Sequence, residues 1–179
     1  MESGTVLWVY NSLERVGVKI WLDGGWGVDA LLEEQTRDHK DLDIVIEQKN
    51  VKQLRNQFNH FKEIKVDIAR PHNFVIADDA GNEIDVHVIE INEHGDGIYG
   101  PKTNGEMFPA ASLAGIGKID GQSVRCVSAE WSLRFHSGYE LKEKDYRDMA
   151  ALCRKFSLKL PDEYKPFLQT TTDTRPRSR

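Results

Sequence analysis

The stretch from Trp21 to Glu47 constrains the fold of this chain more than any other part of the sequence. It reads WLDGGWGVDALLEEQTRDHKDLDIVIE, and its order is a short strand, a glycine pair, a helix, a basic loop and a second strand. Glycines ahead of a helix allow close backbone approach, and the N–H groups at the positive end of the helix dipole are free to bind an anion. The pattern therefore predicts a phosphate-binding turn at Gly24 and Gly25.

Two aspartates stand at the start of the second strand of this stretch. Because alternate side chains of a strand share a face, Asp41 and Asp43 should project together, and Leu42 and Ile44 should face the other way. Two neighbouring carboxylates attract a hard divalent cation, and Mg²⁺ usually binds carboxylates together with substrate phosphates. A glycine pair alone is more often a tight turn, and an Asp-x-Asp alone is more often a solvated strand edge. The glycine pair and the two aspartates together, in this order, indicate chemistry on a nucleotide.

Hydrophobic periodicity and turn residues predict the other elements of the chain. Helices are expected over residues 5–16, 26–34, 51–59, 129–137 and 142–155, the third of them with a capping pair, Asn50 and Gln53. Strands are expected over 19–22, 63–68, 74–77 and 83–89, with hairpin turns at 78–82 and at Asp120-Gly121. The Gly-rich and Asn-rich segment 92–104 is expected to be a loop.

The strand over 83–89 alternates strictly between apolar and polar residues. Asp85 and His87 fall on its polar face, so Asp85 is presented in the same way as Asp41 and Asp43. In isolation, this face would be read as the wet side of an antiparallel strand. Beside the glycine pair and the two aspartates, it predicts a third acid of the same site.

Length and charge limit the classes of protein to consider. We expect one domain over 1–169, with a core over about 1–105, a C-terminal part over about 106–169 and a disordered tail over 170–179. The net charge of −5 argues against a broad nucleic-acid-binding surface. No apolar run is long enough for a membrane span, and the N-terminus lacks the features of a signal peptide. Cys126 and Cys153 fit no metal or disulfide spacing, so we expect reduced, buried thiols in a cytoplasmic protein.

Four motifs carry a resemblance to a known family: WLDGGWGVD, HKDLDI, IDVHVIEIN and CVSAEWSLRFHSGYEL. They resemble those of the small lincosamide nucleotidyltransferases and, more distantly, those of the aminoglycoside 2''-nucleotidyltransferases. The similarity runs from about Val18 to Leu152. Both groups belong to the polymerase-beta-like nucleotidyltransferases. The resemblance implies an α+β fold, in which a short mixed β-sheet is backed by helices and followed by a small C-terminal helical segment.

The resemblance also implies an activity and the residues that perform it. The reaction is transfer of AMP from MgATP to a hydroxyl of a lincosamide such as lincomycin or clindamycin, with release of pyrophosphate. Asp41, Asp43 and Asp85 match the catalytic acids that bind Mg²⁺, with two ions expected. Gly24 and Gly25 match the phosphate-binding turn, where the wider superfamily usually has Gly-Ser. Because Gly25 replaces that serine, backbone N–H groups must bind more of the phosphate, helped by Arg37 or Lys40.

Four further residues are candidates for contacts with the acceptor or the nucleotide. His87 matches a histidine of the family, and a structural hydrogen bond is an equally good explanation for it. His136 and Tyr139, in the FHSGYEL segment, are weighed evenly between lining the pocket and packing the helix. For the general base we favour Asp85, with Glu90 and His87 as rivals.

Other functions fit parts of the pattern. An aminoglycoside 2''-nucleotidyltransferase is the nearest alternative, followed by a toxin–antitoxin nucleotidyltransferase that modifies a protein or tRNA. An Asp-x-Asp glycosyltransferase would need a larger domain, and a non-catalytic cation-binding module would not need three aspartates. The expected partners are a nucleotide and a small-molecule antibiotic, without nucleic acid or membrane. The oligomeric state is open, and a homodimer is one option.

Overall fold

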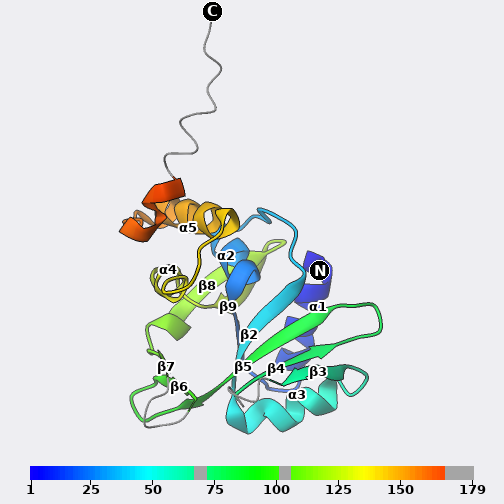
Figure 1. Ribbon diagram of the computed structural model, residues 1–179. Coiled ribbons are helices and arrows are strands. Elements are labelled where there is room, and N and C mark those ends of the chain that lie inside the picture. Colours follow the sequence, from blue (N-terminus) through cyan, green and yellow to red (C-terminus); the bar gives the residue numbers. More distant parts are fainter. Residues whose placement is uncertain (67–71, 101–105, 168–179) are drawn as a thin grey trace, which may run out of the picture.

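A computed structural model describes residues 1–66, 72–100 and 106–167. Its centre is a mixed sheet in the order β3-β4-β5-β2-β1-β9-β8 (Figure 1). The strands are β1 (Ile20–Leu22), β2 (Asp41–Glu47), β3 (Lys62–Val66), β4 (Asn73–Ala77), β5 (Glu83–Ile91), β6 (Gly97–Tyr99), β7 (Glu106–Phe108), β8 (Gly115–Ile119) and β9 (Gln122–Cys126). β2 pairs with β5, and β1 with β9, in parallel, and the other pairings are antiparallel. The predicted mixed sheet is confirmed.

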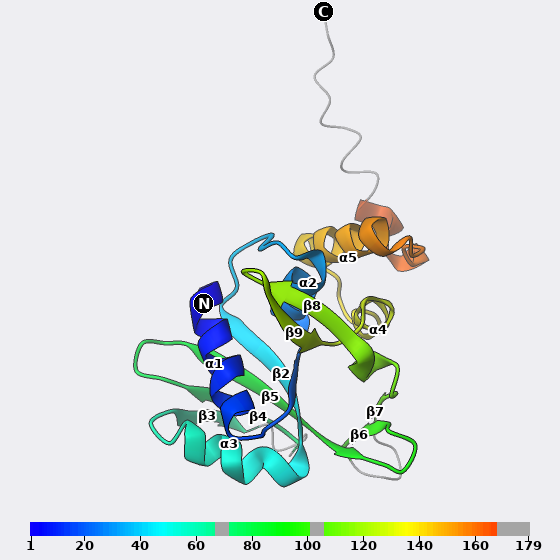
Figure 2. The same cartoon turned by 180° about the vertical axis from the view of Figure 1, so that it is seen from behind.

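The helices share a hydrophobic core with this sheet. They are α1 (Ser3–Arg15), α2 (Gly24–Leu32), α3 (Val51–Gln57), α4 (Ala129–Phe135) and α5 (Glu143–Phe156). Figure 2 shows α1 and α3 against the strands, while α4 and α5 lie near α2 at the opposite end of the molecule. Single 3₁₀ turns occur at Gln48–Asn50, Ser112–Ala114 and Asp162–Tyr164. The predicted α+β class, with helices behind a mixed sheet and a C-terminal helical segment, is confirmed.

The two faces of the central strands serve different purposes. Leu42, Ile44 and Ile46 of β2 are fully buried in the larger core, which also contains the apolar sides of α1, α2 and α3. Val45 faces the other way, into a smaller core with Ile89 and the aromatic residues Trp21, Tyr99 and Phe108. By strand alternation, Asp41 and Asp43 lie on the face of this smaller core. The sheet therefore supports the acids from behind with a fully apolar layer.

At Gly117 of β8, the backbone of helix α2 lies too close to the strand for a side chain. A β-carbon at Gly117 would lie 2.3 Å from the carbonyl oxygen of Ala30 and 2.8 Å from the nitrogen of Leu31. These are backbone atoms of α2, so they have no rotamer by which to move away. Any larger residue must therefore push α2 off the strand, and α2 begins with the glycine pair of the predicted site.

We accordingly expect Gly117→Ala to destabilise the fold by about 3 kcal/mol, the upper range for an overpacked contact. For a domain of this size the melting temperature should fall by roughly 6–12 °C, because 1 kcal/mol corresponds to about 2–4 °C. Thermal unfolding followed by circular dichroism measures the shift. Gly4→Ala is the control, since a β-carbon there meets no atom within 4 Å. A Gly117→Ala protein that melts with the control would contradict this packing.

Three details of the predicted elements are corrected. Gly24 and Gly25 are the first two residues of α2 and do not precede it. The expected loop 92–104 contains strand β6, because Asn92 accepts hydrogen bonds from the backbone of His94 and Asp96 and turns the chain back onto β5. Asn50 makes no capping hydrogen bond, and the Gln53 side chain instead donates to the carbonyl of Val16.

One further predicted element is confirmed, and others lie outside the described residues. The Asp120-Gly121 hairpin is confirmed: both residues have positive φ, 47° and 78°, as a tight two-residue turn requires. Strands β8 and β9 of the C-terminal part join the central sheet, so the two parts of the predicted domain share one sheet. The predicted tail 170–179, residues 67–68 of the expected strand and residues 101–104 of the expected loop lie outside the described residues.

Candidate active site

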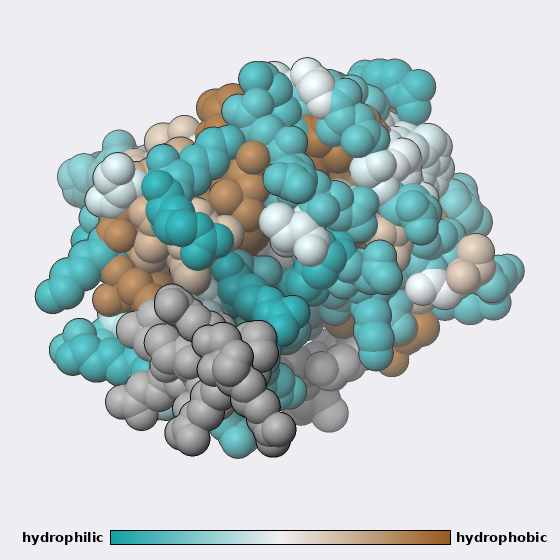
Figure 3. Space-filling model, turned by 90° about the horizontal axis from the view of Figure 1, so that it is seen from above, coloured by the Kyte–Doolittle hydropathy of each residue, from teal (hydrophilic) through white to brown (hydrophobic). Residues whose placement is uncertain are grey.

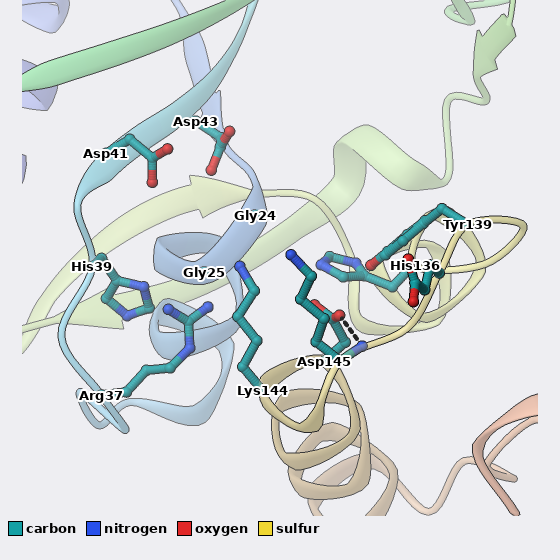
Figure 4. A pocket seen from close by; sticks show the side chains of 12 residues that line it. Gly24, Gly25, Arg37, His39, Asp41, Asp43, His136, Tyr139, Lys144 and Asp145 are labelled. Atoms are coloured by element: carbon teal, nitrogen blue, oxygen red, sulfur yellow. Dashed lines mark hydrogen bonds between the residues drawn. The ribbon is translucent and has the colours of Figure 1, made fainter. Parts of the chain in front are cut away.

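The parallel pairing of β2 with β5 brings two of the predicted acids together. Asp43 lies directly opposite Asp85, and Val45 lies opposite His87. Ligand atoms of Asp43, Asp85 and His87 all lie within 4.8 Å of one another. Asp41, at the exposed start of β2, is not in this group, but its carboxylate points to the same cavity as that of Asp43 (Figure 4). Two close carboxylates with a third nearby are an oxygen donor set suited to Mg²⁺.

His87 lies among carboxylates. Its Nε2 is 3.7 Å from Oδ1 of Asp43, and its Nδ1 is 3.4 Å from the hydroxyl of Tyr99. Burial alone would lower the pKa of His87, but the nearby negative charges of Asp43, Asp23 and Asp85 outweigh burial and raise this pKa. Asp23, the residue before Gly24, has its pKa raised by burial and by the like charge of Asp43, against the opposing charge of His87.

The raised pKa of His87 predicts a pH-dependent stability of the metal-free protein. A histidine whose pKa is higher in the folded state stabilises that state fully below its unfolded pKa of about 6.5. The contribution disappears as the pH rises through the folded value. In buffer with EDTA, the melting temperature of the wild type should exceed that of His87→Gln most at pH 6, and the gap should narrow toward pH 9. A gap that stays constant over this range would contradict the assignment.

A cavity of about 500 Å³ opens in front of the glycine pair and the acids. Figure 4 shows Asp41 and Asp43 of β2 on one side, Lys144 of α5 extending toward Gly25, and His136 and Tyr139 across from them. The lining residues are Gly24, Gly25, Arg37, His39, Asp41, Asp43, His136, Tyr139, Glu140, Lys142, Lys144 and Asp145. Seen from the α5 end, the surface is mainly hydrophilic with smaller hydrophobic patches (Figure 3). The carboxylates of Asp41 and Asp43, together with the cations of Arg37, Lys142 and Lys144, suit a metal-bound polyphosphate.

The two glycines of the turn have different physical reasons to be glycine. Gly24 has a positive φ of 54°, and a β-carbon there would lie 2.1 Å from Oδ2 of Asp43. Gly25 has an ordinary φ, but a β-carbon there would lie 2.3 Å from Nδ1 of His39 and 2.8 Å from an amino nitrogen of Arg37. Gly24 thus leaves room for the acid, and Gly25 leaves room for the basic loop.

The C-terminal segment closes the far side of the cavity. His136 is bound through Nδ1 to the carbonyl of Ser132, at 2.8 Å. Burial and the neighbouring Asp145 raise the pKa of Tyr139 to about 12, so its phenol is neutral at neutral pH. Asp145 also caps α5 by accepting a hydrogen bond from the backbone of Lys142, at 2.8 Å. The cap sets the start of α5, from which Lys142 and Lys144 line the cavity.

A second cavity, of about 420 Å³, adjoins the first. Its lining includes Asp23 and His87, which are neighbours of Gly24 and Asp43 in the first cavity. The remaining lining residues are Tyr99, Met107, Phe108, Arg134, Phe135 and Ser137. Aromatic and apolar side chains therefore form half of this second lining. Asp43 and its neighbour His87 stand where a polar cavity and a more apolar one meet, and Asp85, which lines neither cavity, lies opposite Asp43 on β5.

The structure brings most of the predicted site residues together, but not all. Lys40 is exposed and lines neither cavity, and the same holds for Glu90 among the described residues. Glu90 is separated from Asp85 by an odd number of positions, so regular alternation turns it to the other face of β5. The predicted reduced thiols Cys126 and Cys153 are both free and buried.

The lining residues of the two cavities that were not predicted from the sequence include Asp23, His39, Lys142 and Lys144. Asp23 and His39 stand directly beside the predicted glycines and aspartates, so a wider window around those motifs would have included them. The lysines come from a segment a hundred residues away in sequence, and no local pattern distinguishes them from other surface lysines.

Comparisons with known proteins identify the family of this chain. A family model described as aminoglycoside-2''-adenylyltransferase matches residues 5–152. The chain belongs to this family. It is thus a nucleotidyltransferase, as its motifs indicated. Within the described residues, no helix of this adenylyltransferase is both long and apolar enough to cross a membrane.

Individual relatives of this adenylyltransferase agree with its family. A lincosamide resistance protein of Staphylococcus haemolyticus is 27% identical over 148 residues, which cover 82% of this chain and 91% of the relative. The lincomycin-bound crystal structure of the lincosamide antibiotic adenylyltransferase LnuA has a TM-score of 0.75 at 27% identity, covering 85% of this chain and 96% of LnuA. ANT(2'')-Ia in complex with adenylyl-2''-tobramycin has a TM-score of 0.68 at 17% identity, covering 86% and 88%. The resemblance stated from the motifs is confirmed.

Proposed function

We propose that this adenylyltransferase transfers AMP from MgATP to a hydroxyl of a lincosamide and releases pyrophosphate, in the cytoplasm, where ATP is supplied. The observation that carries the proposal is the meeting of two unlike cavities at Asp43 and His87. One is polar and faces the glycine turn, and in the other half of the lining residues are aromatic or apolar. Such an arrangement suits a polyphosphate donor and an amphiphilic acceptor whose reacting groups meet at the acids.

The nucleotide is assigned to the polar cavity. Its volume of about 500 Å³ is within the usual range for small-molecule sites. The start of α2 at Gly24 and Gly25 offers backbone N–H groups to the phosphates. Lys142 and Lys144 supply positive charge from the opposite wall, and Arg37 lies next to Gly25. Stabilising the negative charge that moves to the departing pyrophosphate is the main catalytic task in such a reaction.

We assign Mg²⁺, with two ions, to Asp41, Asp43 and Asp85. The donor set fits, because all three are carboxylates, and Asp43 and Asp85 are directly paired across β2 and β5. A divalent cation bound there would activate the attacking hydroxyl and neutralise charge on the transferred phosphate. Imidazole is a poorer ligand for Mg²⁺, so His87 is assigned to the acceptor side, next to Tyr99.

The acceptor is assigned to the second cavity. Phe108, Phe135 and Met107 offer an apolar wall to the alkyl groups of a lincosamide, while its sugar hydroxyls face Asp23 and His87. An aminoglycoside is a polycation and would need several carboxylates around it. Asp23 is the one acid in this lining, which also contains the cation of Arg134. The chemistry of the wall therefore favours the lincosamide, with the aminoglycoside as the second candidate.

We infer that Asp85 also accepts the proton of the attacking hydroxyl. Asp85→Asn should then lower kcat by about 10²–10⁴-fold, the usual contribution of a general base. Raising the pH should recover part of the rate, since the hydroxyl then loses its proton without help, and extra Mg²⁺ should not. A pH and Mg²⁺ series on Asp85→Asn and on His87→Ala decides between the two bases. Rescue of Asp85→Asn by Mg²⁺, together with loss of activity in His87→Ala, would assign the base to His87.

The proposed acceptor is tested by comparing kcat/KM for lincomycin and kanamycin, with pyrophosphate release as the readout. We expect lincomycin to be favoured by on the order of 100-fold, equivalent to about 2.7 kcal/mol of transition-state binding. A preference for kanamycin would select the aminoglycoside alternative. Reaction with neither, but labelling of a protein or tRNA from labelled ATP, would select the toxin–antitoxin alternative.

A further inference from the structure

The loop between α2 and β2 lacks regular secondary structure, yet two of its side chains are placed over the phosphate turn. Nδ1 of His39 and an amino nitrogen of Arg37 are the atoms that a β-carbon at Gly25 would meet, at 2.3 and 2.8 Å. Both residues line the polar cavity. A loop that carries two such groups needs something to hold it in place.

One support is Asp29 of α2, which is 1% exposed. Its Oδ1 accepts hydrogen bonds from the backbone N–H of Thr36 at 3.2 Å and from the hydroxyl of Thr36 at 2.7 Å. Its Oδ2 is hydrogen-bonded to Nε2 of His39, at 2.5 Å. The other ring nitrogen, Nδ1, has no hydrogen-bond partner in the described part of the chain and is the one next to Gly25. His39 itself is only 5% exposed.

The other support is Asp148 of α5, which is 4% exposed. Its Oδ2 accepts from Nε of Arg37 at 3.2 Å and from an amino nitrogen of Arg37 at 2.9 Å, so the guanidinium is held by one edge. A second amino group of Arg37 donates to the carbonyl of Asp38, at 3.3 Å. The contact between Arg37 and Asp148 joins the loop to α5, the helix that also carries Lys144.

Neither aspartate lines the cavity, and each reaches it through one loop residue. We propose that Asp29 and Asp148 are positioning residues of the nucleotide site, which hold His39 and Arg37 over Gly25 where the triphosphate binds. The inference rests on the proposed function only for the identity of that ligand. Both carboxylates are buried, so a loop movement that left either without its donors would cost free energy. The loop is therefore held in place. Groups fixed before binding need no ordering when the phosphate arrives.

The test is a pair of double-mutant cycles: Asp148→Asn with Arg37→Gln, and Asp29→Asn with His39→Gln. Titration calorimetry measures the affinity for the α,β-methylene analogue of ATP with Mg²⁺ and, separately, for adenosine. Asp162→Asn is the matched control, because this acid pairs with Lys165 away from the cavity. Partial unfolding would weaken the apparent affinity for both ligands by the same factor, so the adenosine titration separates it from a local effect on the triphosphate. If Asp29→Asn fails to fold, Thr36→Val removes one bond to Asp29 and takes its place.

Each Asp→Asn change should weaken the triphosphate analogue about tenfold, as expected for one charge-assisted contact, and leave adenosine binding unchanged. Each double variant should bind no more weakly than its Arg37→Gln or His39→Gln parent. Equal weakening of both ligands, unchanged or tighter triphosphate binding, or additive effects in the cycles would overturn the inference. Because no acceptor is present, these results are independent of whether lincomycin is a substrate.

Discussion

An Asp43→Asn variant is expected to lose on the order of 10³ in kcat while folding as stably as the wild type. The carboxylate faces Asp85 across the parallel pair of strands and lies beside His87, so removing its charge removes a central part of the metal site. The apolar layer behind it, formed by Leu42 and Ile44, is untouched. Relief of the repulsion between close carboxylates should if anything raise the melting temperature in metal-free buffer.

The measurement is a steady-state product assay combined with thermal unfolding in EDTA. Asp41→Asn should behave in the same way, because its carboxylate points to the same cavity (Figure 4). Asp79→Asn is the control, since that acid is exposed on the hairpin and pairs with Lys62. Near-normal turnover in the Asp43 variant would remove the basis of the metal assignment.

The second large effect is expected at Gly24. In Gly24→Ala the new β-carbon would lie 2.1 Å from Oδ2 of Asp43, so the carboxylate must leave its position. The positive φ of 54° adds a backbone cost of roughly 1–2 kcal/mol for a residue other than glycine. We expect about a 100-fold loss of kcat, because a catalytic group displaced by about 1 Å costs that much.

A matched variant separates the two contributions. Gly81 has a positive φ of 84°, but a β-carbon there meets no atom within 4 Å. Gly81→Ala should therefore lose only the backbone contribution to stability and keep full activity. Melting temperatures and kcat of the two variants, measured side by side, give the comparison. Similar loss of activity in both would mean that backbone strain, and not contact with Asp43, limits the reaction.

Local sequence patterns predicted the features that depend on residues close together in the chain. The glycine pair, the alternation of Asp41 and Asp43, and the polar face of Asp85 and His87 could all be read because each is set by the period of one element. The register that places Asp43 opposite Asp85 could be inferred only through the resemblance, since pairing between strands forty residues apart leaves no local signal. The same resemblance supplied the mixed sheet.

What the sequence could not predict depends on contacts between distant segments. Lys142 and Lys144 reach the cavity because Asp145 caps α5, and Asp148 of the same helix binds Arg37. The sequence predicts a loop where strand β6 lies, because three residues with a glycine are too short for a periodic pattern. Lys40 is predicted, beside Arg37, from its charge and its place in the basic loop, but it is exposed and outside both cavities. In each case tertiary packing, and not local preference, decided the outcome.

The most direct test of the proposed function is mass spectrometry of lincomycin after incubation with the protein and MgATP. We predict a product heavier by one adenylyl group, formed together with pyrophosphate, dependent on Mg²⁺ and absent with Asp43→Asn. Kanamycin in a parallel reaction should remain unmodified or react far more slowly. Unchanged lincomycin, in a sample whose binding of the magnesium–ATP analogue has been verified by calorimetry, would contradict the proposal.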